Sequence, residues 1–241
     1  MQAEAFLLVI ATGIVVMLIS MALDFLWAQA MPVRVFYYII KAPGVIIHEC
    51  AHVLGCLITG ATIKKVVLFS REGGSVTYTS PKIPYLGHVV ISSAPLFVIP
   101  LVLAGCTWVF SQYLGCALPP LPSGADSMDA VLGLGRGIVE MFTRNLFVRF
   151  NAWFLLYLYL TLTLVLSLAP STQDIKNAAI GIGIITLVGI LILWSSLPLA
   201  VTILEGITRL IGIGFAFGLM FGIIALVISS PLMVWYVHKH F

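Results

Sequence analysis

The chain has 241 residues, of which 61% are hydrophobic and only 9% are charged, and its mean hydropathy is +1.14. Soluble domains carry roughly 25% charged residues, so this composition excludes a water-soluble globular protein. The net charge of +3 is small and scattered along the chain, which argues against nucleic acid as a partner. The surface of the folded chain is therefore expected to face a lipid bilayer.

Long apolar runs predict an all-α polytopic membrane protein with about six transmembrane helices, since roughly 18 apolar residues suffice for a span. The first run is interpreted as a retained helix rather than a signal peptide, because residues 1–4 carry no Lys or Arg. We interpret residues 1–241 as a single integral membrane domain. The predicted spans are residues 4–29, 35–60, 84–112, 146–169, 175–198 and 207–236.

Residues 61–84 differ from the runs around them, because charged residues here alternate with β-branched residues. Two such stretches flank Gly73 and Gly74, which predicts a short membrane-associated β-hairpin over residues 62–80, after the second span. Four basic residues crowd into this segment, and the positive-inside rule therefore favours a cytoplasmic hairpin. They are Lys64, Lys65, Arg71 and Lys82.

The second predicted span contains the sequence His48-Glu49-Cys50-Ala51-His52. Residues four apart lie on one helix face, so both imidazoles can reach the same metal ion. A zinc ion held in this way activates water, and Glu49 is placed to accept a proton from that water. A chance match is the alternative, but ionisable groups within an apolar span are costly and usually functional. The motif predicts zinc-dependent peptide hydrolysis with Glu49 as the catalytic base.

The segment after the third predicted span begins as a Pro-rich loop and becomes amphipathic over residues 127–144. This pattern predicts a helix lying at the membrane interface. In the last predicted span, Gly214, Gly218 and Gly222 form two overlapping G-x-x-x-G motifs. Small residues on one helix face allow another helix to approach closely. The approaching helix belongs either to the same bundle or to a second copy, so a homo-oligomer is one of two alternatives.

The motif and its surroundings resemble the site-2 protease family of intramembrane zinc metalloproteases. The resemblance rests on residues 47–55, on the hairpin that follows, and on Ser92-Ser93-Ala94-Pro95 in the next span. It implies a multi-pass protein of the cell membrane whose zinc site lies nearer the cytoplasmic face. It also implies that the substrates are transmembrane proteins.

The resemblance further implies a third zinc ligand, which in this family is usually an Asp in an Asn-Pro-x-x-Asp-Gly type context. The best match is residues 169–174, which end in Asp174 but lack the Asn and are not followed by Gly. Asp174 is therefore the candidate ligand, although Ser171 and Asp174 also approximate a capping box at a helix start. The rival ligands are His88, Asp24, Glu140 and Glu205. Of these, His88 is the strongest, because it falls on the hairpin side of the predicted topology.

In the same family the hairpin helps to hold an extended substrate, and a free strand edge offers hydrogen bonds to an unwound helix. The candidate substrate-binding or oxyanion-stabilising residues are His88, Phe69, Gly74 and Val76. The family often carries an Asn near the reacting carbonyl, at a position where this chain has Val98. That role is either vacant or filled by another group, such as His88 or Asn151.

The leading functional interpretation is an intramembrane endopeptidase with one Zn²⁺ per chain. It would hydrolyse peptide bonds within or near the transmembrane segments of its substrates. The second interpretation is a catalytically inactive relative that binds metal or transmembrane helices. A small metal transporter is the third, and it is disfavoured because the last two predicted spans are almost purely apolar. The expected partners are the lipid bilayer and transmembrane protein substrates.

Overall fold

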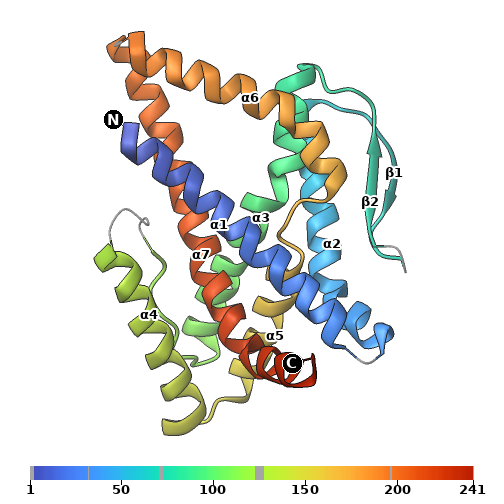
Figure 1. The fold of residues 1–241 in the computed structure, drawn as a ribbon, viewed down its shortest axis with the longest axis vertical. Coiled ribbons are helices and arrows are strands. Elements are labelled where there is room, and N and C mark those ends of the chain that lie inside the picture. Colours follow the sequence, from blue (N-terminus) through green and yellow to red (C-terminus); the bar gives the residue numbers. More distant parts are fainter. Residues whose placement is uncertain (1–2, 32, 71–72, 123–127, 196, 241) are drawn as a thin grey trace.

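The computed structural model describes residues 3–31, 33–70, 73–122, 128–195 and 197–240. The predicted turn residues Arg71 and Glu72, and Ser127 at the start of the predicted interfacial helix, lie outside these ranges. In chain order the elements are α1 (Ala3–Ala30), α2 (Arg34–Thr59), β1 (Ile63–Val67), β2 (Ser75–Tyr78), α3 (Pro84–Tyr113), α4 (Met128–Phe142), the π-helix η1 (Thr143–Val148), α5 (Ala152–Leu166), α6 (Thr172–Ser195) and α7 (Pro198–His240). The hairpin lies beside α2, and α4 lies on the opposite side of the molecule near α7 (Figure 1).

Four of the described helices, α1, α2, α3 and α7, are long and apolar enough to cross a membrane. The other two predicted spans fall on α5, which has 15 residues, and on α6, which has 24 residues and in which Gly183–Ser195 is the apolar stretch among the fully described residues. A helix rises about 1.5 Å per residue, so 15 residues reach about 22 Å, less than the roughly 30 Å of a hydrocarbon core. The chain is a helical membrane protein, and the count of six spans is not confirmed.

The fourth predicted span is shortened at both ends by local backbone features. Asn151 caps the start of α5 by accepting a hydrogen bond from the Trp153 backbone N–H at 3.0 Å. At the other end the chain turns at Ser167 before Pro170, which cannot continue a helix. The span predicted from hydropathy runs past both ends of α5, because the flanking residues are also apolar.

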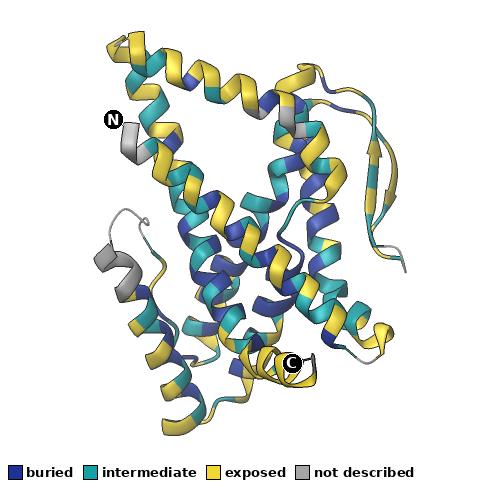
Figure 2. Cartoon of the chain, in the orientation of Figure 1, coloured by how far each residue is buried: buried dark blue, intermediate teal, exposed yellow. Residues whose placement is uncertain are grey.

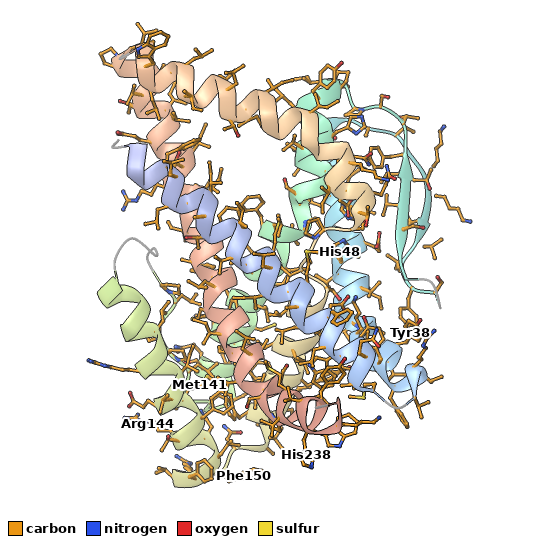
Figure 3. The ribbon with its side chains drawn as sticks, viewed as in Figure 1. Tyr38, His48, Met141, Arg144, Phe150 and His238 are labelled. Atoms are coloured by element: carbon orange, nitrogen blue, oxygen red, sulfur yellow. The ribbon has the colours of Figure 1, made fainter. Side chains whose placement is uncertain are left out.

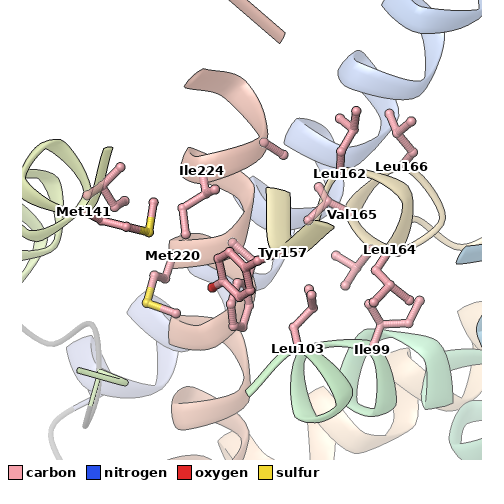
Figure 4. Close-up of a cluster of buried hydrophobic side chains, with 14 of the residues drawn as sticks. Ile99, Leu103, Met141, Tyr157, Leu162, Leu164, Val165, Leu166, Met220 and Ile224 are labelled. Carbon is pink, nitrogen blue, oxygen red and sulfur yellow. The ribbon is translucent and has the colours of Figure 1, made fainter. Parts of the chain in front are cut away.

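The main buried hydrophobic cluster takes its residues largely from α1, α3, α4, α5 and α7, and the buried parts of these helices face one another (Figure 2). Tyr157 of α5 is fully buried in this core, and its hydroxyl lies 3.0 Å from that of Thr107 in α3. Leu103 of α3 and Met220 of α7 belong to the same cluster (Figure 4). The core therefore holds α5 between α3 and α7 and places the end of α5 close to α2.

The predicted amphipathic helix is present as α4, which ends at Phe142 where η1 begins, and its location at the membrane interface stays a prediction. Leu134, Ile138 and Met141 are buried in the core, whereas Val139 on the other face is 67% exposed. This division agrees with the amphipathic pattern of the sequence.

The glycines of α7 contact other helices of the same chain. An ideal Cβ at Gly218 would lie 2.9 Å from Val16 Cγ1, and one at Gly222 would lie 3.3 Å from Ile19 Cγ2, both in α1. Gly214 faces Phe97 of α3. The glycine face of α7 therefore packs against helices of the same chain. A homo-oligomer formed through this face stays a prediction.

The predicted hairpin is present as β1 and β2, which pair antiparallel. Gly73 has a φ of 104°, a conformation that glycine adopts readily. Val76 and Tyr78 of β2 pack against the buried residues Cys56 of α2 and Ile91 of α3. The hairpin is therefore anchored beside the C-terminal half of α2.

Two glycines let α2 approach its neighbours closely on either side of the sequence motif. The Gly44 N–H donates to Thr163 Oγ1 of α5 at 3.0 Å, and a Cβ at Gly44 would overlap the Thr163 carbonyl oxygen. A Cβ at Gly55 would lie 2.8 Å from the Ile91 Cα of α3. These approaches bring α3 and α5 within reach of the side chains between the two glycines.

We expect Gly44→Ala to lower the free energy of unfolding by about 1–3 kcal/mol, because the added methyl group pushes α5 away from α2. Denaturant titration of the detergent-solubilised protein measures this change. Gly105→Ala is the matched control, since a Cβ at Gly105 meets no described heavy atom within 4 Å. Equal stability of the two variants would contradict the close approach of α2 and α5.

Candidate metal centre

His48 and His52 lie one turn apart on α2 and face the same side of the helix. Their relative exposures are 8% and 6%, and their Nε2 atoms are 3.0 Å apart. His48 lies about midway along α2, near the beginning of α6 (Figure 3). The pairing predicted from the spacing of the motif is therefore present, in the interior of the protein.

A backbone carbonyl from another element holds the other ring nitrogen of each histidine. His48 Nδ1 bonds the Ser167 carbonyl after α5, and His52 Nδ1 bonds the Ile91 carbonyl of α3 at 2.8 Å. Carbonyl oxygens only accept hydrogen bonds, so both Nδ1 atoms carry a proton, and each ring in its neutral form presents a lone pair at Nε2. This tautomer is the one that metal-binding histidines adopt when a carbonyl orients the ring.

Asp174 reaches the two histidines from the first turn of α6. Its Oδ1 lies 3.5 Å from His52 Nε2, and its Oδ2 lies 3.9 Å from His48 Nε2. The centre therefore combines two neutral ring nitrogens with one carboxylate.

Ser171 and Asp174 also form the capping box that the sequence suggested. Asp174 Oδ2 accepts hydrogen bonds from the Ser171 N–H at 2.9 Å and from the Ser171 hydroxyl at 2.6 Å. In return the Asp174 N–H donates to Ser171 Oγ at 3.2 Å. The capping role and the position beside the histidines are compatible, because the cap engages Oδ2 and leaves Oδ1 facing His52.

The donor set fits a single divalent ion. Zinc bonds of about 2.0–2.1 Å at tetrahedral angles separate ligand atoms by about 3.3–3.4 Å. The 3.0 Å between the two Nε2 atoms and the 3.5 Å between His52 Nε2 and Asp174 Oδ1 lie around this value, and one ligand atom from each of the three residues lies within 4.8 Å of the others. Three protein ligands would leave one position for water or substrate, which is typical of catalytic zinc. Among the described residues, these three form the cluster suited to a metal.

Glu49 lies beside the cluster and is 6% exposed. The hairpin reaches it at Gly74, where an ideal Cβ would lie 2.7 Å from Glu49 Cδ and Oε1. The backbone of the hairpin therefore passes directly over the carboxylate. A side chain at this position would take the space of Glu49.

Two of the rival ligands are engaged elsewhere. Asp24 of α1 accepts a hydrogen bond from the Tyr37 hydroxyl at 2.6 Å and pairs with Lys41 at 2.6 Å. Glu140 pairs with Arg144 one turn along α4 at 2.8 Å, and both side chains are exposed. Neither carboxylate belongs to the His48 cluster.

The other two rivals also lie outside the cluster. His88 Nδ1 lies 3.3 Å from the Tyr78 hydroxyl of β2, so this residue links α3 to the hairpin. Glu205 lies in α7. This arrangement does not support His88 as an alternative metal ligand. The substrate-binding role of His88 stays a prediction.

The remaining candidates occupy different surroundings. Val76 packs against the buried cluster beneath the hairpin, and Phe69 is 42% exposed. The Asn151 side chain donates to the Leu114 carbonyl at 2.9 Å and caps α5, so it is committed to the fold. Val98 of α3 is partly buried. Substrate contacts by Phe69 and Val76 stay predictions.

Sequence reasoning missed the two carbonyls that orient the histidines. The Ser167 and Ile91 carbonyls act through the backbone, which leaves no mark in the residue type. A partial signal was available for Ser167, because it lies just before the Pro170 break where a helix end exposes unpaired carbonyls.

Fold and site together define a helical membrane protein with two buried histidines, a partly buried Asp beside them and an adjacent Glu. Residues 7–118 match the sequence model of the family described as Peptidase M50B-like, which supports membership of the site-2 protease family. The match includes His48, Glu49 and His52, and Asp174 lies beyond it. No curated protein and no solved structure matches the chain.

Ser171→Ala removes the hydroxyl that holds Asp174 Oδ2, and we expect zinc affinity to fall about tenfold, as for other partners that orient ligands. Chelator competition on the purified protein measures the change, and Asp174→Ala should lose more. Gln173→Ala is the control, since it removes an exposed 2.8 Å hydrogen bond to Asn177 in the same turn. Equal losses in the Ser171 and Gln173 variants would contradict the orienting role.

Proposed function

We propose that the chain is an intramembrane zinc-dependent endopeptidase, which cleaves transmembrane proteins within or near their membrane segments. The observation that carries the proposal is the pair of His48 and His52 Nε2 atoms 3.0 Å apart, with Asp174 facing them and Glu49 alongside. Membership of the site-2 protease family supports the same activity. His48, His52 and Asp174 would hold one zinc ion per chain.

Bound zinc would supply a Lewis acid that polarises the scissile carbonyl and lowers the pKa of the attacking water. Glu49 accepts a proton from that water as the water oxygen bonds the carbonyl carbon. Glu49 then returns the proton to the leaving amide nitrogen as the carbon–nitrogen bond breaks, so the products are a carboxyl and an amine. The carbonyls of Ser167 and Ile91 keep both imidazoles in the tautomer that this arrangement needs.

Substrate binding is assigned to the hairpin side of the centre. A transmembrane helix must unwind before its peptide bond can be hydrolysed, and an unpaired strand edge offers the freed backbone new hydrogen bonds. The contact between Gly74 and Glu49 brings the hairpin backbone to the reacting position. Phe69, which follows β1, and His88, which lies 3.3 Å from the Tyr78 hydroxyl of β2, are assigned to the substrate as well.

The hairpin side is assigned to the cytoplasm. Lys64, Lys65 and Lys82 are all exposed on or next to the hairpin. Positive charge in short loops is enriched on the cytoplasmic side of membranes. The metal centre would then lie nearer the cytoplasmic face of the cell membrane.

A catalytically inactive relative is the second candidate. Two observations favour it: the hairpin backbone lies against Glu49, and an apolar Val98 stands where the family often has an Asn. Such a protein would bind zinc and transmembrane helices without cleavage. Zinc binding without hydrolysis by the wild type would select this candidate.

Glu49→Gln should abolish cleavage while zinc binding persists, because the amide keeps the shape but cannot accept the proton. Loss of general-base catalysis predicts a rate about 10²–10⁴-fold lower. Cleavage is measured by mass spectrometry in proteoliposomes, on a single-span reporter whose transmembrane segment contains Gly and Pro. A Glu49→Gln protein that cleaves at the wild-type rate would remove Glu49 from the mechanism.

Gly74→Ala should reduce cleavage of the same reporter without changing zinc affinity, because its methyl group takes space next to the Glu49 carboxylate. A loss of at least about tenfold is expected for a misplaced catalytic group. Ser75→Ala, at the exposed neighbouring position, should cleave normally. Full activity of the Gly74 variant would show that the hairpin and Glu49 do not meet during catalysis.

A further inference from the structure

The connection between α5 and α6, residues 167–171, determines the geometry of the metal centre. It supplies the Ser167 carbonyl that bonds His48 Nδ1, and it leads directly into the turn that carries Asp174. Two of the three cluster residues therefore depend on where this short segment lies. Whatever holds the segment also positions them.

Most backbone N–H groups of the connection are satisfied locally, and Pro170 has none. The local donors are Ser167 N to Leu164 O at 3.2 Å, Leu168 N to Val165 O at 3.2 Å, and Ser171 N to Asp174 Oδ2 at 2.9 Å. The Ala169 N–H is different, because it donates at 2.9 Å to Ser20 Oγ, which comes from α1.

Ser20 joins both sides of the helix break with a single hydroxyl. Its Oγ accepts from the Ala169 N–H and donates to the Val165 carbonyl at 2.6 Å, and the residue is 0% exposed. Both of these hydrogen bonds go to backbone atoms, and neither goes to His48, His52 or Asp174. It fixes the backbone on either side of Ser167, whose carbonyl orients His48.

We propose that Ser20 of α1 is a positioning residue for the metal centre, acting through the connection that presents the Ser167 carbonyl and Asp174. The inference rests on the proposed function, because it concerns the zinc site. Without the Ser20 hydroxyl, the half-buried Ala169 N–H loses its partner inside the protein, and an unpaired donor away from water is costly. The connection relaxes toward another partner, and the ligands that depend on it move apart.

The test compares the zinc affinity of full-length wild type, Ser20→Ala and Ser229→Ala in detergent, by chelator competition with zinc alone. Ser229 of α7 is the matched control, because it is also 0% exposed and its hydroxyl accepts a 2.9 Å hydrogen bond from Trp27 of α1. Both variants remove one buried serine hydroxyl that bonds a second helix. The absorption spectrum of the Co²⁺-substituted proteins reports the ligand geometry separately from stability.

We expect Ser20→Ala to lose about 10- to 100-fold in zinc affinity and to alter the Co²⁺ spectrum, as loss of a ligand-orienting partner does elsewhere. Ser229→Ala should lose stability alone and keep both metal readouts. If Ser20→Ala does not fold, Ser20→Cys keeps the size of the side chain with a weak hydrogen-bonding group, and it should show the same change in smaller measure.

Wild-type affinity and spectrum in Ser20→Ala, or in Ser20→Cys when that variant is used, would overturn the inference and leave the proposed function intact. An equal loss of affinity in Ser229→Ala would overturn it too, since the effect would then be general destabilisation. A wild-type protein that binds no zinc would overturn both the metal site and the role of Ser20.

Discussion

The structure depends most on the close approach of two ring nitrogens, His48 Nε2 and His52 Nε2, which lie 3.0 Å apart. With the Nδ1 atoms held by carbonyls, two neutral rings direct their Nε2 lone pairs into one space, and the Asp174 carboxylate adds negative charge there. A cation in this space would be attracted to all three groups, and the rest of the fold prevents the rings from turning away. Helix α3 holds one ring through the Ile91 carbonyl, and the end of α5 holds the other through Ser167.

The packing of the bundle serves this arrangement. The approach at Gly44 brings α5 against α2, and the core around Tyr157 keeps α5 between α3 and α7. The first helix adds Ser20, which bonds the backbone on both sides of the break after α5. Helix α3 and the end of α5, which are far apart in the chain, therefore contact the same helical turn of α2.

The local features of the site were predictable from sequence, because they follow from periodicity and residue type. The spacing of His48 and His52 predicts a shared face, and the glycines at 73 and 74 predict the turn. Features that depend on tertiary contacts were not predictable in the same way. Hydropathy reports composition rather than helix length, so the stop at Ser167 was missed. Backbone carbonyls are present in every residue type, so the partners of the histidines left no pattern to find.

Asp174 both caps the start of α6 and faces the two histidines, so formation of this helix also positions the third candidate ligand. One oxygen of Asp174 satisfies the backbone of Ser171, and the other points toward His52. A chain in which α6 has not yet formed cannot present an oriented carboxylate, so an ion held by all three residues would bind only after α6 has formed. Once captured, the ion would resist fraying of the first turn of α6, because unwinding that turn would remove a ligand.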